Sequence, residues 1–277
     1  MDRGTYASRT SLKAHMGIAT TDTADDATLL SKLEAASRFI DGPYGCNRHF
    51  YVKTATRTFT SQFTNKLLLD YDLLSITSLK HDSDTDWDYD YTWAATDYHL
   101  YPFNEYPKTK IMTKSGGDYS FPSQEEGVQI AGLWGYGTGD TATPYTDSGT
   151  NTAEELDASE TGVDVGDGTA LAVGQTILVE SEQMYITAIS TNTLTVVRGV
   201  NGTTAATHAT SKDVYIYQYP PQITEACVLL AVKLFRLKDA PYGVIGSGGD
   251  MGVVMAGRLL DPRIVELLAS YRREVVV

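Results

Sequence analysis

The sequence predicts an α+β protein. A small helical bundle, formed by the N- and C-terminal segments, is expected to carry a central β region and an inserted small β-barrel or sandwich. Apolar residues recur at helical spacing only up to about residue 41 and from about residue 221 onward. Short strand-like runs, separated by polar or glycine-containing turns, fill the chain between them. Because a helix buries only one face and needs a partner, the two chain ends are expected to pack against each other.

Two helices are expected at the N-terminal end. Residues 10–18 form a short helix that ends at Gly17. Thr23 is expected to cap the second helix, with Asp25 and Asp26 at its positive end. Pro43 and Gly45 end this helix, whose apolar positions are Leu29, Leu30, Leu33, Ala36, Phe39 and Ile40.

The region after these helices is expected to hold two sets of short strands. The central β region has its strand candidates at residues 57–60, 66–69, 75–79, 110–113 and 127–133. Residues 137–161 have few large apolar side chains and are predicted to be a linker. The second set has strands at 177–179, 184–186, 194–196 and 214–216, with hairpin turns at 180–183 and 191–192 and a further turn at 201–202.

Helical spacing returns after Pro220. The helix from Pro221 is apolar on so many sides that it must lie in a core or in an oligomer interface. The glycine-rich residues 246–249 are interpreted as a helix–helix connection, because a phosphate-binding loop needs a preceding strand and a following Lys-Ser/Thr. Asp261 is expected to cap the last helix, with Pro262 in its first position. The expected domains are residues 1–53 and 218–277 for the bundle, 54–140 for the central β region and 141–217 for the inserted β domain.

The composition argues against a membrane-spanning protein, a secreted protein and a disulfide-rich or zinc-binding protein. No apolar run approaches the ~20 residues that span a bilayer. The first residues lack a basic-then-apolar signal pattern, so synthesis in a cytosol is expected. Cys46 and Cys227 are too few for a disulfide framework or a zinc site and are expected to be buried thiols.

The net charge of −13 is unevenly distributed. Residues 1–53 and residues 218–277 each hold seven Lys/Arg and six Asp/Glu, whereas residues 54–217 hold eight and twenty-three. The helical ends are therefore near neutral and suited to packing against copies of the chain, while the acidic β part repels nucleic acid.

No catalytic, cofactor or metal site is predicted. The five histidines are scattered, and no nucleophile–base pattern is present, which favours a protein that is not an enzyme. Asp82, Asp84, Asp86, Asp88 and Asp90 alternate as in a calcium loop. That loop, however, needs Gly at position six and Glu at position twelve, where this chain has two tryptophans. An exposed acidic hairpin tip is expected, with weak calcium binding as the alternative.

The N-terminal block carries a resemblance to a known family. Thr10-Ser11-Leu12-Lys13, Gly17-Ile18, Asp25-Asp26, Ala35-Ala36-Ser37 and Arg48-His49-Phe50 resemble the head–tail connector (adaptor, or head-completion) proteins of tailed bacteriophages. The C-terminal stretch is similar to the same family in Gly135-Tyr136, Pro221 with its long apolar helix, Asp261-Pro262-Arg263-Ile264 and Tyr271-Arg272-Arg273.

The inserted unit resembles a small β module of phage virion proteins. The matching residues include Gly174, Glu182, Arg198-Gly199, Gly202-Thr203 and His208. In that module Arg198 and His208 are expected to tie turns together. The purpose of the insertion is left open.

The connector resemblance implies a virion neck protein, made in the host cytoplasm, that forms a dodecameric ring joining the portal to the tail. Its implied partners are the portal protein, further copies of itself and a tail-side neck or tail-terminator protein, with genomic DNA passing through the ring without specific binding. The alternative is a peripheral receptor- or carbohydrate-binding virion component. The expected portal-docking residues are Arg272, Arg273, Val275, Val276 and Val277, and the expected ring-interface residues are Leu29, Leu33, Phe39, Leu230, Leu234 and Leu267.

Overall fold

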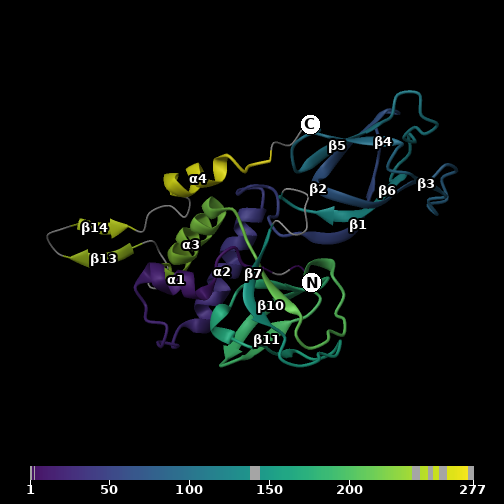
Figure 1. Cartoon of the computed structure of the whole chain (residues 1–277). Helices are drawn as coiled ribbons and strands as arrows, with labels where there is room; N and C mark the ends of the chain where they lie inside the picture. Colours follow the sequence, from purple (N-terminus) through teal and green to yellow (C-terminus); the bar gives the residue numbers. More distant parts are fainter. Residues whose placement is uncertain are drawn as a thin grey trace.

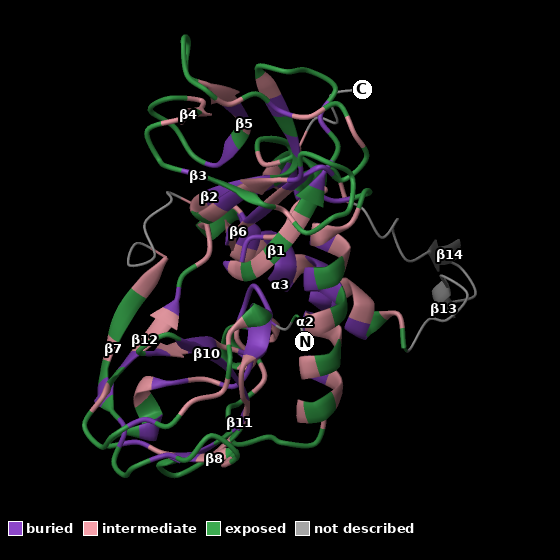
Figure 2. Cartoon of the chain, turned by 90° about the vertical axis from the view of Figure 1, so that its right-hand side faces the viewer, coloured by how far each residue is buried: buried purple, intermediate pink, exposed green. Residues whose placement is uncertain are grey.

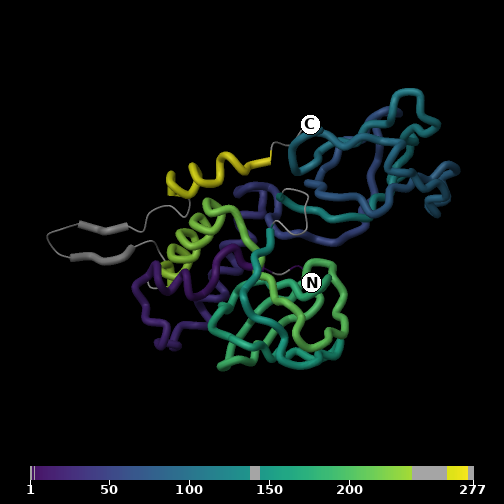
Figure 3. Tube along the Cα trace, in the orientation of Figure 1, coloured from purple at the N-terminus to yellow at the C-terminus, as the bar shows by residue number. Residues whose placement is uncertain are grey.

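The structure is a computed structural model that describes residues 2, 4–137, 144–238, 244–248, 252–255 and 261–273. It confirms the predicted α+β class. Helices from both ends of the chain lie together, and two antiparallel six-stranded sheets extend from them (Figure 1). The chain passes from the first helices through one sheet and then the other before it returns to the helices (Figure 3).

The N-terminal helices begin and end close to the predicted residues. In α1 (Arg9–Met16), Ser8 caps the start by accepting a hydrogen bond from the Ser11 amide, and Gly17 closes the helix in the left-handed region at a φ of 70°. α2 runs from Asp26 to Asp41. The predicted cap at Thr23 is wrong, because the helix starts two residues later than that cap implies and Asp25 occupies the cap position without a side-chain hydrogen bond.

The C-terminal helices are α3 (Pro221–Arg236) and α4 (Pro262–Ala269). The predicted cap is confirmed, since the Asp261 carboxylate accepts a hydrogen bond from the Arg263 amide at 3.1 Å. Between these helices, β13 (Val244–Gly248) pairs antiparallel with β14 (Gly252–Met255). The glycine-rich segment is therefore not a simple helix–helix connection, because β13 takes its hydrogen bonds from β14.

The two chain ends share one core. α2 and α3 pack along each other, and α1 and α4 both contact α3. The Ser37 hydroxyl and the Cys227 thiol lie 3.4 Å apart inside this core, although 190 residues separate them in the chain. Both cysteines are buried and free, as expected. The buried cluster also includes Leu12, Leu29, Leu33, Ile40, Ile223, Leu230, Ile264 and Leu268.

The first sheet, here called sheet A, has the order β1-β6-β2-β5-β4, with β3 paired to the far part of β2. Two predicted strands, 66–69 and 75–79, are one strand, β2, whose register shifts between Leu68 and Leu73. Its inner face packs around the fully buried Trp134. The strands are β1 (Lys53–Phe59), β2 (Lys66–His81), β3 (Tyr91–Trp93), β4 (Tyr98–Tyr101), β5 (Lys108–Thr113) and β6 (Val128–Trp134).

The second sheet, here called the β module, has the order β7-β12-β9-β10-β11-β8 around its own buried cluster. The linker prediction for 137–161 is wrong in its described part. β7 pairs with β12 there, and Leu156 is fully buried. β7 lies largely exposed at the outer side of the module (Figure 2), which explains its lack of apolar residues. The strands are β7 (Tyr145–Asn151), β8 (Gly162–Asp164), β9 (Thr176–Val179), β10 (Glu182–Ser190), β11 (Thr193–Val197) and β12 (Asp213–Tyr217).

The hairpin turns of the module use residues with positive φ. Thr191 has a φ of 55° in the turn between β10 and β11, at the predicted position. The turn between β9 and β10 is shorter than predicted, because β10 already begins at Glu182 and Glu180 takes the positive φ of 53°. Among the described residues, no helix is long and apolar enough to cross a membrane.

Candidate assembly surfaces

The β module is fastened to the helical bundle by backbone and side-chain contacts. The Thr5 hydroxyl donates to the Gly174 carbonyl at 2.6 Å, and the Arg9 amide donates to the Val173 carbonyl at 3.0 Å. Leu30 of α2 packs against the hydrophobic core of the module. The insertion therefore does not hang from a flexible stalk but shares packing with the N-terminal segment.

The module is also seated against the first strand of sheet A. Gly202 approaches β1 so closely that a Cβ placed there would lie 1.9 Å from the Thr54 carbonyl oxygen. The Gln183 amide donates to the Val52 carbonyl at 2.9 Å, and Asn201 donates to Gln183 at the same distance. The Asn201-Gly202 turn thus has a packing role, because only glycine permits this approach.

A buried ionic network holds the module together. Glu182 has no accessible surface, and it accepts hydrogen bonds from Arg198 Nε at 2.7 Å and Nη2 at 2.8 Å. His208 lies between Glu182, at 2.9 Å from Nε2, and Glu180, at 2.8 Å from Nδ1. Burial alone would raise the pKa of Glu182, but the hydrogen bonds from Arg198 and His208 lower it overall.

Arg198 also serves the surrounding loops. Its Nη1 donates to the carbonyls of Asp157, at 2.9 Å, and Glu160, at 2.8 Å, and its Nη2 donates to the Ala206 carbonyl at 2.7 Å. This is the turn-tying role that the sequence predicted for Arg198 and His208. The network is structural, because each of these contacts joins the side chain to the module's own turns.

The predicted ring-interface residues divide into two groups. Leu29, Leu33 and Leu230 have no accessible surface, because α2 and α3 pack on each other. A side chain without accessible surface cannot contact a neighbouring copy while its core is intact, so for these three the prediction is corrected to a core role. Phe39, Leu234 and Leu267 are only partly buried at the edge of that core, and for them the interface role stays a prediction.

One of the predicted portal-docking residues, Arg273, already makes hydrogen bonds within its own chain. Arg273 donates through its guanidinium to the carbonyls of Leu69 and Asp70, and its amide donates to the Cys46 carbonyl at 2.8 Å. Arg272 is exposed and reaches the Pro43 carbonyl at 3.3 Å. Neither arginine lies within α4, which ends at Ala269. Val275, Val276 and Val277 lie outside the described residues.

Arg273 belongs to a cluster that joins three parts of the chain, here called the Asp72 clasp. The Asp72 carboxylate of β2 is almost fully buried and lies 3.2 Å from Arg48 Nε and 3.6 Å from Arg273 Nη1. Burial raises the pKa of Asp72, and the two arginines act against that rise. The clasp links the loop after α2, the C-terminal segment and sheet A.

Sequence reasoning missed the Asp72 clasp because its members are far apart in the chain. One signal was available. Asp70 and Asp72 interrupt the apolar run of β2, and a carboxylate in such a run requires a buried cation. Which arginine supplies that cation is decided by the tertiary fold.

The acidic segment between β2 and β3 has the expected exposed character except at its first residue. Asp82 is buried and accepts backbone hydrogen bonds from Asp84, Thr85 and Trp87 at 2.8–3.0 Å. Asp84, Asp86, Asp88 and Asp90 lie beyond it, and carboxylate oxygens of Asp82, Asp84 and Asp86 come within 4.8 Å of one another. Weak calcium binding stays a prediction.

Exposed large apolar side chains are unevenly distributed over the described part of the chain. Seven of the nine come from residues 63–106 of sheet A, and Tyr44 and Val265 come from the bundle. None comes from the described residues of the β module. Because exposed aromatic side chains favour contact with partners, sheet A and the bundle present the candidate assembly surfaces.

No protein-family model and no curated protein matches the chain. Among solved structures, it is similar to a chain of the neck of an empty GTA particle computed with C6 symmetry. The two share 13% sequence identity and a TM-score of 0.42, and the comparison covers 97% of this chain and 90% of the other. The identity is too low to transfer a function.

Proposed function

We propose that this chain is a non-enzymatic structural protein of a phage-type virion neck. In this role it is an adaptor whose copies form a ring that joins the portal to the tail and surrounds the DNA channel. The observation that carries the proposal is the shared core of the two chain ends, to which both β units are fastened. The connector-like motifs of α1, α2, α3 and α4 all lie in or beside this core.

The fastening of the parts supports this role. A subunit of a closed ring must present two different faces at a fixed angle, because each copy contacts the next through a heterologous interface. The Asp72 clasp fixes sheet A to the bundle, and the contacts of Gly174 and Gly202 fix the β module. A chain of this construction can hold such an angle.

Charge supports passage of DNA without binding. The described residues of the β module, 144–217, hold two Lys/Arg against ten Asp/Glu. Such a surface repels phosphate, whereas tight DNA binding depends on neutralising phosphates with cations. In the proposed ring, DNA slides through without adhering.

The proposed portal contact starts at the clasp. Arg273 holds the C-terminal segment against β2, and Arg272 beside it is exposed. In the proposed assembly, Arg272 and Val275–Val277 contact the portal, while Arg273 sets the point from which they leave. The remaining proposed partners are a tail-side neck or tail-terminator protein and further copies of the chain, in a dodecamer.

A deletion of residues 274–277 tests the portal contact without touching the clasp. The shortened chain is expected to keep its thermal unfolding midpoint and to lose co-purification with the portal. An Arg272→Glu variant is expected to weaken the same interaction. Unchanged co-purification of both variants would show that the C-terminal segment does not dock on the portal.

The alternative function, a receptor- or carbohydrate-binding virion component, places the binding surface on the β module and on tyrosine-rich strands. The described surface of the module lacks exposed large apolar side chains, so a flat aromatic binding face is not found there. A glycan array with the full chain tests this alternative, and reproducible specific binding would support it over the neck role.

A further inference from the structure

The loop that follows α2, residues 42–47 and here called the Tyr44 loop, presents an aromatic ring to solvent. Tyr44 is 77% exposed, the highest value among the large apolar side chains of the described residues. A single exposed aromatic residue is common on protein surfaces and needs no partner by itself. Tyr44 differs from that ordinary case because its loop is fixed on two sides and has an exposed arginine beside it.

The Tyr44 loop is folded back onto the end of α2. The Gly45 amide donates to the Gly42 carbonyl at 3.0 Å, and the Cys46 amide donates to the Ile40 carbonyl at 2.7 Å. A Cβ placed at Gly45 would lie 2.3 Å from the Ile40 carbonyl oxygen, so only glycine permits this close approach. The backbone on both sides of Tyr44 is therefore held by α2.

The C-terminal segment fixes the same loop from its other side. The Arg273 amide donates to the Cys46 carbonyl at 2.8 Å, and Arg272 Nη2 donates to the Pro43 carbonyl at 3.3 Å. The Arg272 side chain is exposed. An aromatic ring and a guanidinium group thus lie beside each other on the surface, although 228 residues separate Tyr44 from Arg272 in the chain.

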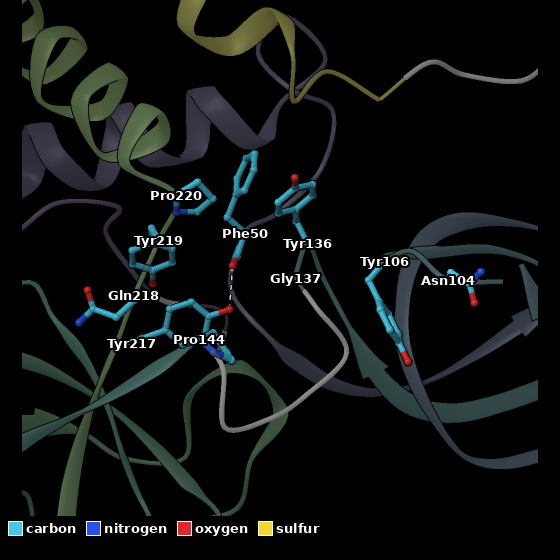
Figure 4. A pocket seen from close by; sticks show the side chains of 10 residues that line it. All are labelled: Phe50, Asn104, Tyr106, Tyr136, Gly137, Pro144, Tyr217, Gln218, Tyr219 and Pro220. Carbon is cyan, nitrogen blue, oxygen red and sulfur yellow. Dashed lines mark hydrogen bonds between the residues drawn. The ribbon is translucent and has the colours of Figure 1, made fainter. Parts of the chain in front are cut away.

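The C-terminal segment is itself held in place by Tyr271. The centre of the Tyr271 ring lies 5.7 Å from that of Phe50 and 5.4 Å from that of Tyr136, two rings that lie side by side in Figure 4. The Tyr271 hydroxyl donates to the Gln222 side chain of α3 at 2.8 Å. The backbone positions that carry Tyr44 and Arg272 are therefore set before any partner binds.

Tyrosine and arginine on a preset backbone suit the centre of a protein–protein interface. Both residue types are enriched among the side chains that supply most of the binding free energy. A tyrosine buries a large ring with few rotatable bonds, and a fixed loop lowers the entropy cost of binding further. A guanidinium group pairs with a carboxylate through two parallel hydrogen bonds. The partner surface that fits is an apolar socket with a carboxylate at its border.

The position of the Tyr44 loop indicates which partner it meets. The proposed portal-docking residues Val275–Val277 follow Arg273 in the sequence, and Val277 can lie at most about 14 Å from Arg273, at ~3.5 Å per residue. A partner that contacts these valines therefore lies beside the Tyr44 loop. We propose that Tyr44 docks in an apolar socket of the portal and that Arg272 pairs with a carboxylate at the border of that socket. This inference rests on the proposed portal contact.

Titration of the immobilised portal with the full chain tests the proposal. Tyr44→Ala is expected to raise the Kd by at least about tenfold, whereas Tyr44→Phe keeps the ring and is expected to change the Kd by less than about twofold. Arg272→Ala is expected to raise the Kd by about fivefold and to make it less sensitive to added salt. All three variants are expected to keep the thermal unfolding midpoint, because both side chains are exposed.

Tyr91→Ala is the matched control, because Tyr91 is 47% exposed and lies on β3 of sheet A. This variant is expected to bind the portal as the native protein does. Equal Kd values for Tyr44→Ala and Tyr91→Ala, together with lost binding after deletion of residues 274–277, would overturn this inference and leave the proposed portal contact standing. Absence of saturable binding by the native protein would overturn both. An effect of Tyr44→Ala on association between copies, without an effect on portal binding, would also overturn the inference.

Discussion

Replacing Arg198 by alanine is expected to lower the free energy of unfolding of the β module by more than the loss of a surface ion pair does. The change leaves Glu182, which has no accessible surface, without its two hydrogen bonds from the guanidinium. It also removes the donor to three loop carbonyls. Breaking a buried pair by removing one partner costs about 3–5 kcal/mol, because the other charge stays buried without that partner.

Lys212→Ala is the matched control for this loss. Lys212 and Glu180 form an ion pair in the same module, but both side chains are about 40% exposed, at 38% and 43%. A pair in that setting contributes about 0–1 kcal/mol. The two variants therefore remove cations from one network and differ in how deeply the pair is buried.

Urea unfolding followed by far-UV circular dichroism gives both free energies, and hydrogen exchange of residues 176–217 assigns the loss to the module. The three tryptophans lie outside the module, at positions 87, 93 and 134, so their fluorescence reports sheet A separately. A cost for Arg198→Ala within about 1 kcal/mol of that for Lys212→Ala would refute the claim that the network holds the module together.

Three further predictions concern the bundle and its joints. Leu33→Ala is expected to lower the free energy of unfolding by about 2–5 kcal/mol, because Leu33 is fully buried between the two chain ends. Leu68→Ala is the control and is expected to lower it little, because Leu68 is 43% exposed; urea unfolding measures both variants. Gly202→Ala is expected to loosen the module from β1, because the new Cβ meets the Thr54 carbonyl, and faster hydrogen exchange in β1 would measure this. Gly149→Ala is the control, because Gly149 also has a left-handed backbone but has open space around it. Burial lowers the pKa of His49 to about 4, so between about pH 4 and 6.5 the folded state binds fewer protons than the unfolded state. The protein is therefore expected to lose about 3 kcal/mol of stability as the pH falls from about 6.5 to 4. Burial raises the pKa of Asp41 to about 7, which acts in the opposite direction, so the His49 contribution is read from the difference between the native protein and His49→Asn across that range. A parallel pH dependence in both proteins would contradict the assignment.

The parts of the fold that the sequence predicted are those with strong local periodicity or caps. α1 with Gly17, α3 after Pro220 and α4 with Asp261 follow from local signals that act within one turn of a helix. The strands β9, β10, β11 and β12 follow from short apolar runs between turns.

The parts that the sequence did not predict depend on pairing. β7 contains threonine, aspartate, serine and glycine, and it is a strand because β12 supplies its hydrogen bonds. β3 and β4 are short edge strands whose formation depends on β2 and β5. The hairpin of β13 and β14 likewise replaces a predicted connection. In each case the partner strand, not local preference, decides the structure.

The same distinction applies to the candidate surfaces. An apolar helix face is visible in the sequence, but whether it meets its own chain or a neighbour is not. In the structure, Leu29, Leu33 and Leu230 pack against the other end of the same chain. The Asp72 clasp collects residues from distant parts of the chain, so it becomes visible only in three dimensions.

Electron cryo-microscopy of assembled particles tests the central proposal most directly. A ring of this chain between the portal and the tail is expected. In that ring the bundle with Phe39, Leu234 and Leu267 meets the neighbouring copy, and the C-terminal segment reaches the portal. Density for the chain at the tail tip or on the capsid surface, with the portal-to-tail junction occupied by other proteins, would contradict it.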